Sequence, residues 1–154
     1  RFKELGVIAS MQTLHAPGIQ FPVDSFLGHI PAKSLPYAFA WNEMRAVSPV
    51  MPFASDWPVS PLDPMLSFYA GMARQPLVPG LPDQRQTLMQ CIAGYTRDGA
   101  YAEFAESRKG KLKPGMLADV CVMNRNLEAS SVDEIKGARA LLTICDGRVT
   151  HGAV

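Results

Sequence analysis

Residues 50–54 read Val-Met-Pro-Phe-Ala and are followed at once by Ser55 and Asp56, and this stretch indicates the fold class. A short apolar run is typical of a strand buried on both faces, in which Pro52 is tolerated near the start. In parallel α/β folds, ligand sites assemble where such strands end. Asp56 is therefore the first candidate for a functional residue.

A second apolar run and several helical patterns surround this strand. Residues 7–11 (Val-Ile-Ala-Ser-Met) predict another short buried strand, after a helical segment at residues 1–5 that Gly6 ends. Further helices are expected at residues 37–46, 65–73, 87–95 and 98–106. Strands that alternate with helices favour an α/β fold with parallel strands.

Two of these helices carry recognisable start signals. Asp63 followed by Pro64 is typical of an N-cap and a first helical residue. Thr87 with Gln90 three positions later matches the capping-box pattern.

The last third of the chain has a different character. Strands are expected at residues 119–123, 141–145 and 148–151, with one helical turn at 131–137. Asp146 and Gly147 form the two-residue sequence that favours a tight hairpin turn. This pattern predicts a small antiparallel layer, and the change in composition near Gly110 predicts a boundary between residues 1–109 and 110–154.

The composition excludes several classes of protein. The chain has 154 residues, and 15 Lys and Arg against 14 Asp and Glu give a net charge of +1. Such a balance predicts no nucleic-acid partner and no membrane-surface partner. The apolar runs are too short for a membrane span, and no leader peptide is visible, so we expect a cytoplasmic protein. Because the sequence begins with Arg1 instead of Met, we also expect a piece of a longer chain.

The three cysteines predict no disulfide framework and no zinc site. Cys91, Cys121 and Cys145 are far apart and form no C-x-x-C pair. We expect them to be buried small hydrophobic residues of a protein in a reducing compartment.

The position of Asp56 allows two interpretations. A carboxylate at the end of a buried strand can bind a divalent cation and take a proton from metal-bound water, whose pKa the metal lowers to about 7. Alternatively, Asp56 simply caps the turn at residues 57–60. Position alone leaves both interpretations open.

The histidines form no metal motif by themselves, because no H-x-H, H-E-x-x-H or H-x-x-x-H spacing occurs. His15 follows a predicted strand, so it could lie at the mouth of a pocket or be a satisfied loop histidine. His29 and His151 are expected in a loop and at an exposed strand end. Trp57 is either a core residue or part of a pocket. The aperiodic stretch at residues 14–36 is a candidate lid or pocket wall.

Residues 54–64 resemble a known family. Ala-Ser-Asp-Trp-Pro-Val at 54–59, followed by Asp-Pro at 63–64, is similar to the G-S-D-x-P-V segment and D-P of metal-dependent amidohydrolases. The resemblance is to the family-3 branch related to N-substituted formamide deformylase and exoenzyme-regulatory proteins. Four further stretches follow the family in the same order: residues 6–12, 95–102, 110–119 (G-x-L-x-P-G-x-x-A-D) and 143–149.

This resemblance implies a fold and an activity. The fold would be α/β, with residues 1–109 as the last strands and helices of a partial (β/α)8 TIM barrel and residues 110–154 as part of a small β-sandwich. The activity would be hydrolysis of non-peptide C–N bonds, of amide or formamide type, by water activated on zinc or a similar divalent metal. Asp56 matches the last-strand aspartate that contacts the metal and carries the proton, and Gln12, His15 and Trp57 would line the substrate pocket.

The chain also departs from the family. A (β/α)8 barrel needs about 250 residues, and the family's first-strand H-x-H, bridging residue and two later histidines have no counterpart here. Ala54 replaces the usual glycine, and Thr13 stands where proline is common. We therefore expect this fragment of a cytoplasmic, bacterial-type enzyme to be inactive alone, with a small-molecule substrate. Its uncovered faces should pack against the missing N-terminal portion or a second copy. The alternative is a non-catalytic regulatory or structural module of the same superfamily.

Overall fold

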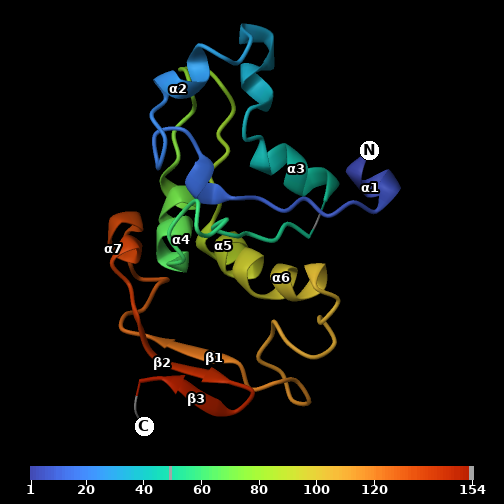
Figure 1. The fold of residues 1–154 in the computed structure, drawn as a ribbon, viewed down its shortest axis with the longest axis vertical. Coiled ribbons are helices and arrows are strands. Elements are labelled where there is room, and N and C mark those ends of the chain that lie inside the picture. The colour runs from blue at the N-terminus through green and yellow to red at the C-terminus, as the bar shows by residue number, and fades with distance from the viewer. Residues whose placement is uncertain (49, 153–154) are drawn as a thin grey trace.

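The computed structural model describes residues 1–48 and 50–152. Its α-helices are α1 (Phe2–Leu5), α2 (Asp24–Leu27), α3 (Trp41–Val47), α4 (Pro64–Ala73), α5 (Leu88–Tyr95), α6 (Arg97–Ala102) and α7 (Val132–Lys136). Two 3-10 helices are η1 (Thr13–His15) and η2 (Ala32–Tyr37), and the strands are β1 (Val120–Met123), β2 (Ala140–Cys145) and β3 (Arg148–His151). Figure 1 shows α1 to α6 at one end of the molecule and the sheet at the other, with α7 beside α4.

The sheet confirms the expected antiparallel layer. Its strand order is β1-β2-β3, with Cys121 opposite Thr143 and Ile144 opposite Val149. The turn between β2 and β3 has positive φ at both Asp146 (49°) and Gly147 (76°). Positive φ at both central residues is the requirement of the predicted two-residue hairpin.

Residues 7–11 and 50–54 are not regular strands, which corrects the expectation of two short strands. They run parallel and share one bridge, in which Met11 N donates to Pro52 O (2.9 Å) and Ala54 N donates to Met11 O (3.0 Å). The other edge of the second segment is bonded to helices, because Phe53 N donates to Gly94 O and Met51 N to Asp98 Oδ2. The pairing between the two segments ends after this one bridge.

The predicted helix starts are confirmed at α4 and α5. Asp63 accepts from Met65 N at 2.9 Å with Pro64 at the first position, and Thr87 and Gln90 make both bonds of a capping box.

Two helix boundaries differ from the expectation. The helix expected at 37–46 starts only at Trp41, because Phe39 has φ +52° and interrupts the helical backbone. The helix expected at 98–106 ends at Ala102, before Phe104 with φ +60°.

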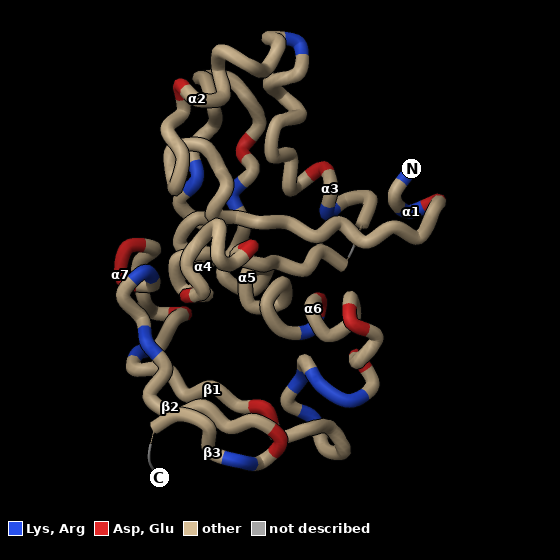
Figure 2. Tube along the Cα trace, in the orientation of Figure 1, with Lys and Arg blue, Asp and Glu red and all other residues tan. Residues whose placement is uncertain are grey.

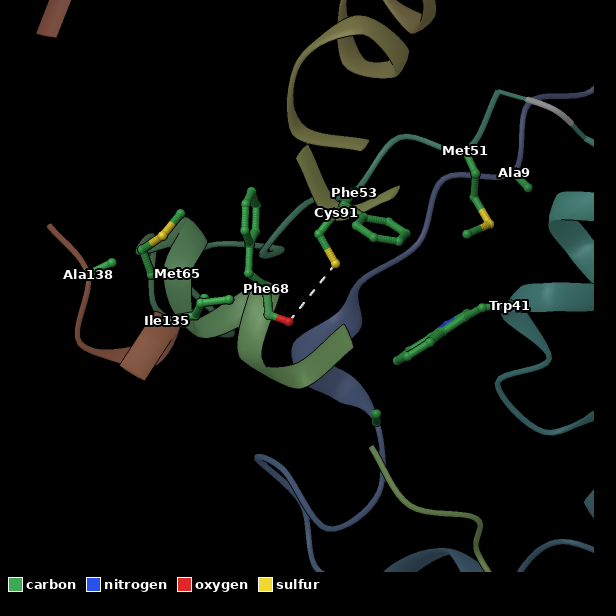
Figure 3. Packing of buried hydrophobic residues seen from close by; sticks show 10 residues of the cluster. Ala9, Trp41, Met51, Phe53, Met65, Phe68, Cys91, Ile135 and Ala138 are labelled. Carbon is green, nitrogen blue, oxygen red and sulfur yellow. Dashed lines mark hydrogen bonds between the residues drawn. The ribbon is translucent and has the colours of Figure 1, made fainter. Parts of the chain in front are cut away.

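Residues 7–11 and 50–54 lie side by side at their shared bridge, and this pair of segments is called the crossing below. The hydrophobic core lies where α4 and α5 meet the crossing (Figure 3). Its members, all buried, are Ala9, Ala16, Trp41, Met51, Phe53, Met65, Phe68, Cys91, Ile135 and Ala138. The last two come from α7 and its C-terminal end, which pack against α4. Residues beyond Gly110 therefore complete the same core that positions the candidate site.

The cysteines correct one expectation in part. Cys91 is buried, as predicted, and burial raises the pKa of its thiol to about 12. Cys121 and Cys145 are exposed, because they lie on the sheet, whose faces the described residues leave largely uncovered.

Charged residues of both signs are scattered along the chain, as Figure 2 shows. The longest basic stretch lies in the connector between α6 and β1, at Arg108, Lys109, Lys111 and Lys113. Lys109 is paired with Glu103 at 2.7 Å. Within residues 1–48 and 50–152, no helix combines the length and the apolar character needed to cross a lipid bilayer.

Candidate functional site

The structure brings His15 and Asp56 together. Each side chain follows one of the two parallel segments, His15 at the end of η1 and Asp56 two residues beyond Ala54. The imidazole Nε2 of His15 lies 3.7 Å from Oδ2 of Asp56. Two segments that run parallel deliver their C-terminal ends to the same edge, which is why residues 41 positions apart in sequence meet here.

Asp56 holds an uncommon backbone conformation. Its φ is +60°, a left-handed value that aspartate tolerates better than most residues. Its side chain is 54% exposed, so the carboxylate is open to a ligand. The following turn is closed by the Asp56 carbonyl oxygen, which accepts from Val59 N at 2.8 Å. The turn therefore does not need the carboxylate.

His15 is held more tightly than its partner. Its side chain is 24% exposed, and its Nε2 is buried with no hydrogen-bond partner among the described residues. The ring packs edge-on against Phe21, with centroids 5.9 Å apart. Thr13 anchors the same 3-10 helix to α4 by donating to Ser67 O at 2.8 Å. The imidazole is thus fixed in place beside Asp56.

The other two predicted pocket residues lie on the same loops. Gln12 is half-buried directly before η1. Trp57 directly follows Asp56 and is 63% exposed, so it is not a core residue, whereas Trp41 and Phe53 are buried. Gln12 and Trp57 therefore flank the His15–Asp56 pair along the chain.

A hydrogen-bonded clamp that the sequence did not reveal joins the two loops. Ser60 Oγ donates to Gln20 Oε1 at 2.5 Å, and Gln20 Nε2 donates to Val59 O at 2.9 Å. Gln20 lies in the aperiodic loop and matches no motif, so no local signal pointed to it. The clamp ties the turn after Asp56 to the loop after His15.

The loop at residues 14–36 is anchored at its far end as well. Phe21, Phe26 and Phe39 form a chain of edge-to-face contacts that starts at His15. Phe39 in turn contacts the guanidinium of Arg74, which donates to the carbonyl oxygens of Phe39 and Ala38. Burial lowers the pKa of Arg74 to about 10. These contacts fit a fixed pocket wall better than a lid.

A shallow hollow of about 370 Å³ lies beside these loops, between the residues that follow Leu14, the start of α4 and the end of α7. It is lined by Leu14, Gly18, Ile19, Gln20, Pro61, Leu66, Tyr69 and Lys136. Most of this lining is apolar, and the ammonium of Lys136 lies over the Tyr69 ring at 4.9 Å.

The described residues do not form a complete metal site. In the ranges 1–48 and 50–152, no group of three or more His, Cys, Asp and Glu side chains gathers as a metal site requires. His15 and Asp56 are therefore a pair of candidate metal-facing groups, and not a full ligand set.

The model of a family described as the amidohydrolase family matches residues 1–151. The curated protein LONG AFTER FAR-RED 3 of Arabidopsis thaliana is 28% identical over 129 residues, which are 82% of this chain and 22% of that protein.

Two solved structures have a similar fold. An uncharacterized metal-dependent hydrolase from Pyrococcus furiosus matches 75% of this chain and 23% of its own, with a TM-score of 0.60 and 24% identity. A second one, from Pyrococcus horikoshii OT3, matches 74% of this chain and 23% of its own, with a TM-score of 0.61 and 22% identity. The chain thus spans less than a quarter of the length of these relatives.

Proposed function

Because the chain belongs to the amidohydrolase family, we propose that it is the C-terminal part of a metal-dependent hydrolase in which Asp56 contacts the metal and carries the proton. The observation that supports this most is the pairing of an accessible Asp56 carboxylate with the unpartnered Nε2 of His15, 3.7 Å away. Both groups follow the C-terminal ends of the two parallel segments, and parallel α/β folds bind their ligands at the corresponding ends of their strands.

The residues present fit a divalent metal such as zinc. A carboxylate oxygen is a normal zinc ligand, and Asp56 would hold the ion with an oxygen that no described Lys or Arg side chain neutralises. His15 Nε2 is one of four buried side-chain nitrogens without a hydrogen-bond partner among the described residues, and it is the one beside Asp56. When bound, such an ion lowers the pKa of a water ligand to about 7 and polarises the scissile carbonyl.

The chain's own residues supply the proton transfer and part of the pocket. Asp56 takes a proton from the attacking water and returns it to the leaving nitrogen, as a general base and then a general acid. In this proposal Gln12, His15 and Trp57 line the substrate pocket beside the carboxylate, and the exposed indole of Trp57 offers an apolar surface to substrate. The proposed substrate is a small molecule with a non-peptide C–N bond of amide or formamide type, as in the formamide deformylase-like branch.

The remaining ligands would come from other parts of the parent protein. A catalytic zinc normally takes three protein ligands, so this chain alone is expected to be inactive. In this proposal residues 1–109 belong to a partial (β/α)8 barrel and residues 110–154 to a β-sandwich. The exposed faces of β1–β3 are covered by the parent's N-terminal portion or by a second copy. We place the parent protein in the cytoplasm.

Substitution of Asp56 tests this function. In the longest natural product of the gene, loaded with zinc, Asp56→Asn should lower kcat/KM for amide or formamide hydrolysis by about 10²- to 10⁴-fold, the usual contribution of a general base. Asparagine tolerates the positive φ, so the fold should be kept. The matched control is Asp63→Asn, which changes a carboxylate in the same loop but keeps the oxygen that caps α4. Equal activity of both variants and the wild type would contradict the proposal.

The second candidate is a non-catalytic regulatory or structural module. A full-length gene product that binds no zinc and hydrolyses no amide in a broad screen would support this alternative.

A further inference from the structure

We propose that His15 is a positioning residue, which fixes the Asp56 carboxylate through a hydrogen bond from Nε2–H to Oδ2. This inference rests on the proposed function, because it assigns a task to His15 at the same site. The other carboxylate oxygen, Oδ1, is then left to face the metal and the water. His15 acts through Asp56 and needs no contact with the substrate.

The first support is the unmet hydrogen-bonding capacity of His15. Nε2 is buried and has no partner within hydrogen-bond distance among the described residues. A buried polar atom without a partner destabilises the folded protein. Oδ2 of Asp56, at 3.7 Å, is the acidic oxygen beside it. A shift of about 0.5 Å brings the pair within the usual hydrogen-bond range.

The second support is the difference in burial and in contacts between the two side chains. The His15 ring is fixed by Phe21 on one side and by the anchored 3-10 helix that carries it. The Asp56 side chain is about half exposed, and no described backbone N–H holds its carboxylate. The more buried His15 is thus placed to orient the more exposed Asp56. Carboxylates that ligate metals are commonly fixed by such hydrogen bonds from neighbouring side chains.

The third support is that contacts on both sides of the pair join the two loops. The Gln20 clamp joins the turn after Asp56 to the loop after His15 through two hydrogen bonds. The parallel bridge at Met11 and Phe53 fixes the segments that precede them. These contacts bring the two loops together, so His15 and Asp56 are neighbours in the fold.

Zinc affinity measured by competition with a chromogenic chelator tests this role, alongside the hydrolysis rate, in the longest natural gene product. His15→Phe removes the donor and keeps the ring shape. It should weaken zinc binding about 10- to 100-fold, the usual effect of losing a hydrogen bond to a metal ligand. His15→Gln carries an amide N–H donor and should restore most of the affinity. The matched control is His29→Phe, because His29 is a loop histidine whose Nδ1 contacts Ser25 O; it should bind zinc like the wild type.

The outcomes separate this inference from the function on which it rests. A wild-type protein without zinc or hydrolytic activity would overturn both. An active, zinc-loaded wild type with unchanged affinity in folded His15→Phe would overturn the positioning role alone. Equal damage from His15→Gln and His15→Phe would also overturn it, since His15 would then act as a ligand itself. If His15→Phe fails to fold by circular dichroism, His15→Leu takes its place under the same criteria.

Discussion

Residues 51–53, in the second segment of the crossing, bury their side chains, whereas the sheet β1–β3 exposes much of both faces. Met51 and Phe53 at the crossing are 0% and 5% exposed, while Leu141 and Val149 in the sheet are 58% and 46% exposed. The crossing has only one bridge between its segments, and the sheet has regular pairing along three strands. Regular hydrogen bonding and burial are therefore separated in this molecule.

This difference shows what supports the candidate site. His15 and Asp56 are held by packing and by long-range polar contacts around the crossing, and the sheet contributes nothing to them directly. The sheet depends on contacts between neighbours in sequence, such as the hairpin turn at Asp146 and Gly147. Its apolar side chains remain available to another surface.

The largest expected contrast between the two regions is in thiol reactivity. At neutral pH a maleimide or disulfide reagent should modify the exposed Cys121 and Cys145 at least about 10³-fold faster than Cys91. The reason is that burial raises the pKa of Cys91 to about 12, against about 8.5 for an ordinary thiol, and the thiolate is the reactive form. Mass spectrometry of timed samples measures the three rates, and rapid labelling of Cys91 in the folded chain would break the comparison.

The same reagent sharpens the comparison in the longest natural gene product. If other parts of the parent protein cover the sheet, Cys121 and Cys145 should be protected there and reactive in the isolated chain. Equal rates in both proteins would contradict the proposed covering of the sheet.

A smaller contrast is expected in stability. Phe53→Ala removes a buried ring from the core and should lower the free energy of unfolding by about 3–5 kcal/mol. Val149→Ala in β3 should cost about 1 kcal/mol or less, because its side chain is half exposed. Urea unfolding followed by circular dichroism gives both values. Similar losses for the two variants would mean that the sheet contributes as much to the free energy of unfolding as the crossing does.

The smallest expected effect concerns the cap of α7, which connects the sheet region to the core. Hydrogen bonds from Ser131 N and Ser131 Oγ hold the pKa of the Glu134 carboxyl below its ordinary value. A lowered folded-state pKa means that this cap stabilises the protein fully above the ordinary pKa and less as the pH falls through the lower one. In an NMR titration, Ser131→Ala should move the Glu134 midpoint upward; an unchanged midpoint would show that the side-chain bond contributes nothing.

Local signals in the sequence predicted the elements that depend on neighbours. The cap at Asp63, the capping box at Thr87 and the hairpin at Asp146 are each determined within about four residues, and the structure has all three. The helix stop at Gly6 is also as expected, with φ +64°.

Long-range partners could not be predicted in this way. Asp98 is completely buried, where it accepts from Met51 N and is paired with Arg97 at 2.8 Å and Arg45 at 3.9 Å. Nothing near Asp98 in sequence distinguishes it from an exposed helix-start residue. Residues 7–11 and 50–54 were recognised as candidate strands by their apolar character. Whether they form a regular β-ladder depends on the elements beside them in space, which are distant in sequence.

The candidate site shows the same division. Asp56 was found from its position after an apolar run and from the resemblance to amidohydrolases, and His15 from its place after the preceding run. The clamp of Gln20 and Ser60 joins residues 40 positions apart and has no sequence signal. The functional roles of Asp56, Gln12, His15 and Trp57 stay predictions.

We propose above all that the Asp56 carboxylate, which follows residues 50–54, faces a metal ion. A crystal structure of the longest natural gene product grown with zinc tests it directly, with the ion located by its anomalous signal. We expect a zinc ion about 2.0–2.2 Å from a carboxylate oxygen of Asp56, with His15 beside that residue. A zinc ion bound elsewhere in the protein, with Asp56 pointing into solvent, would contradict it.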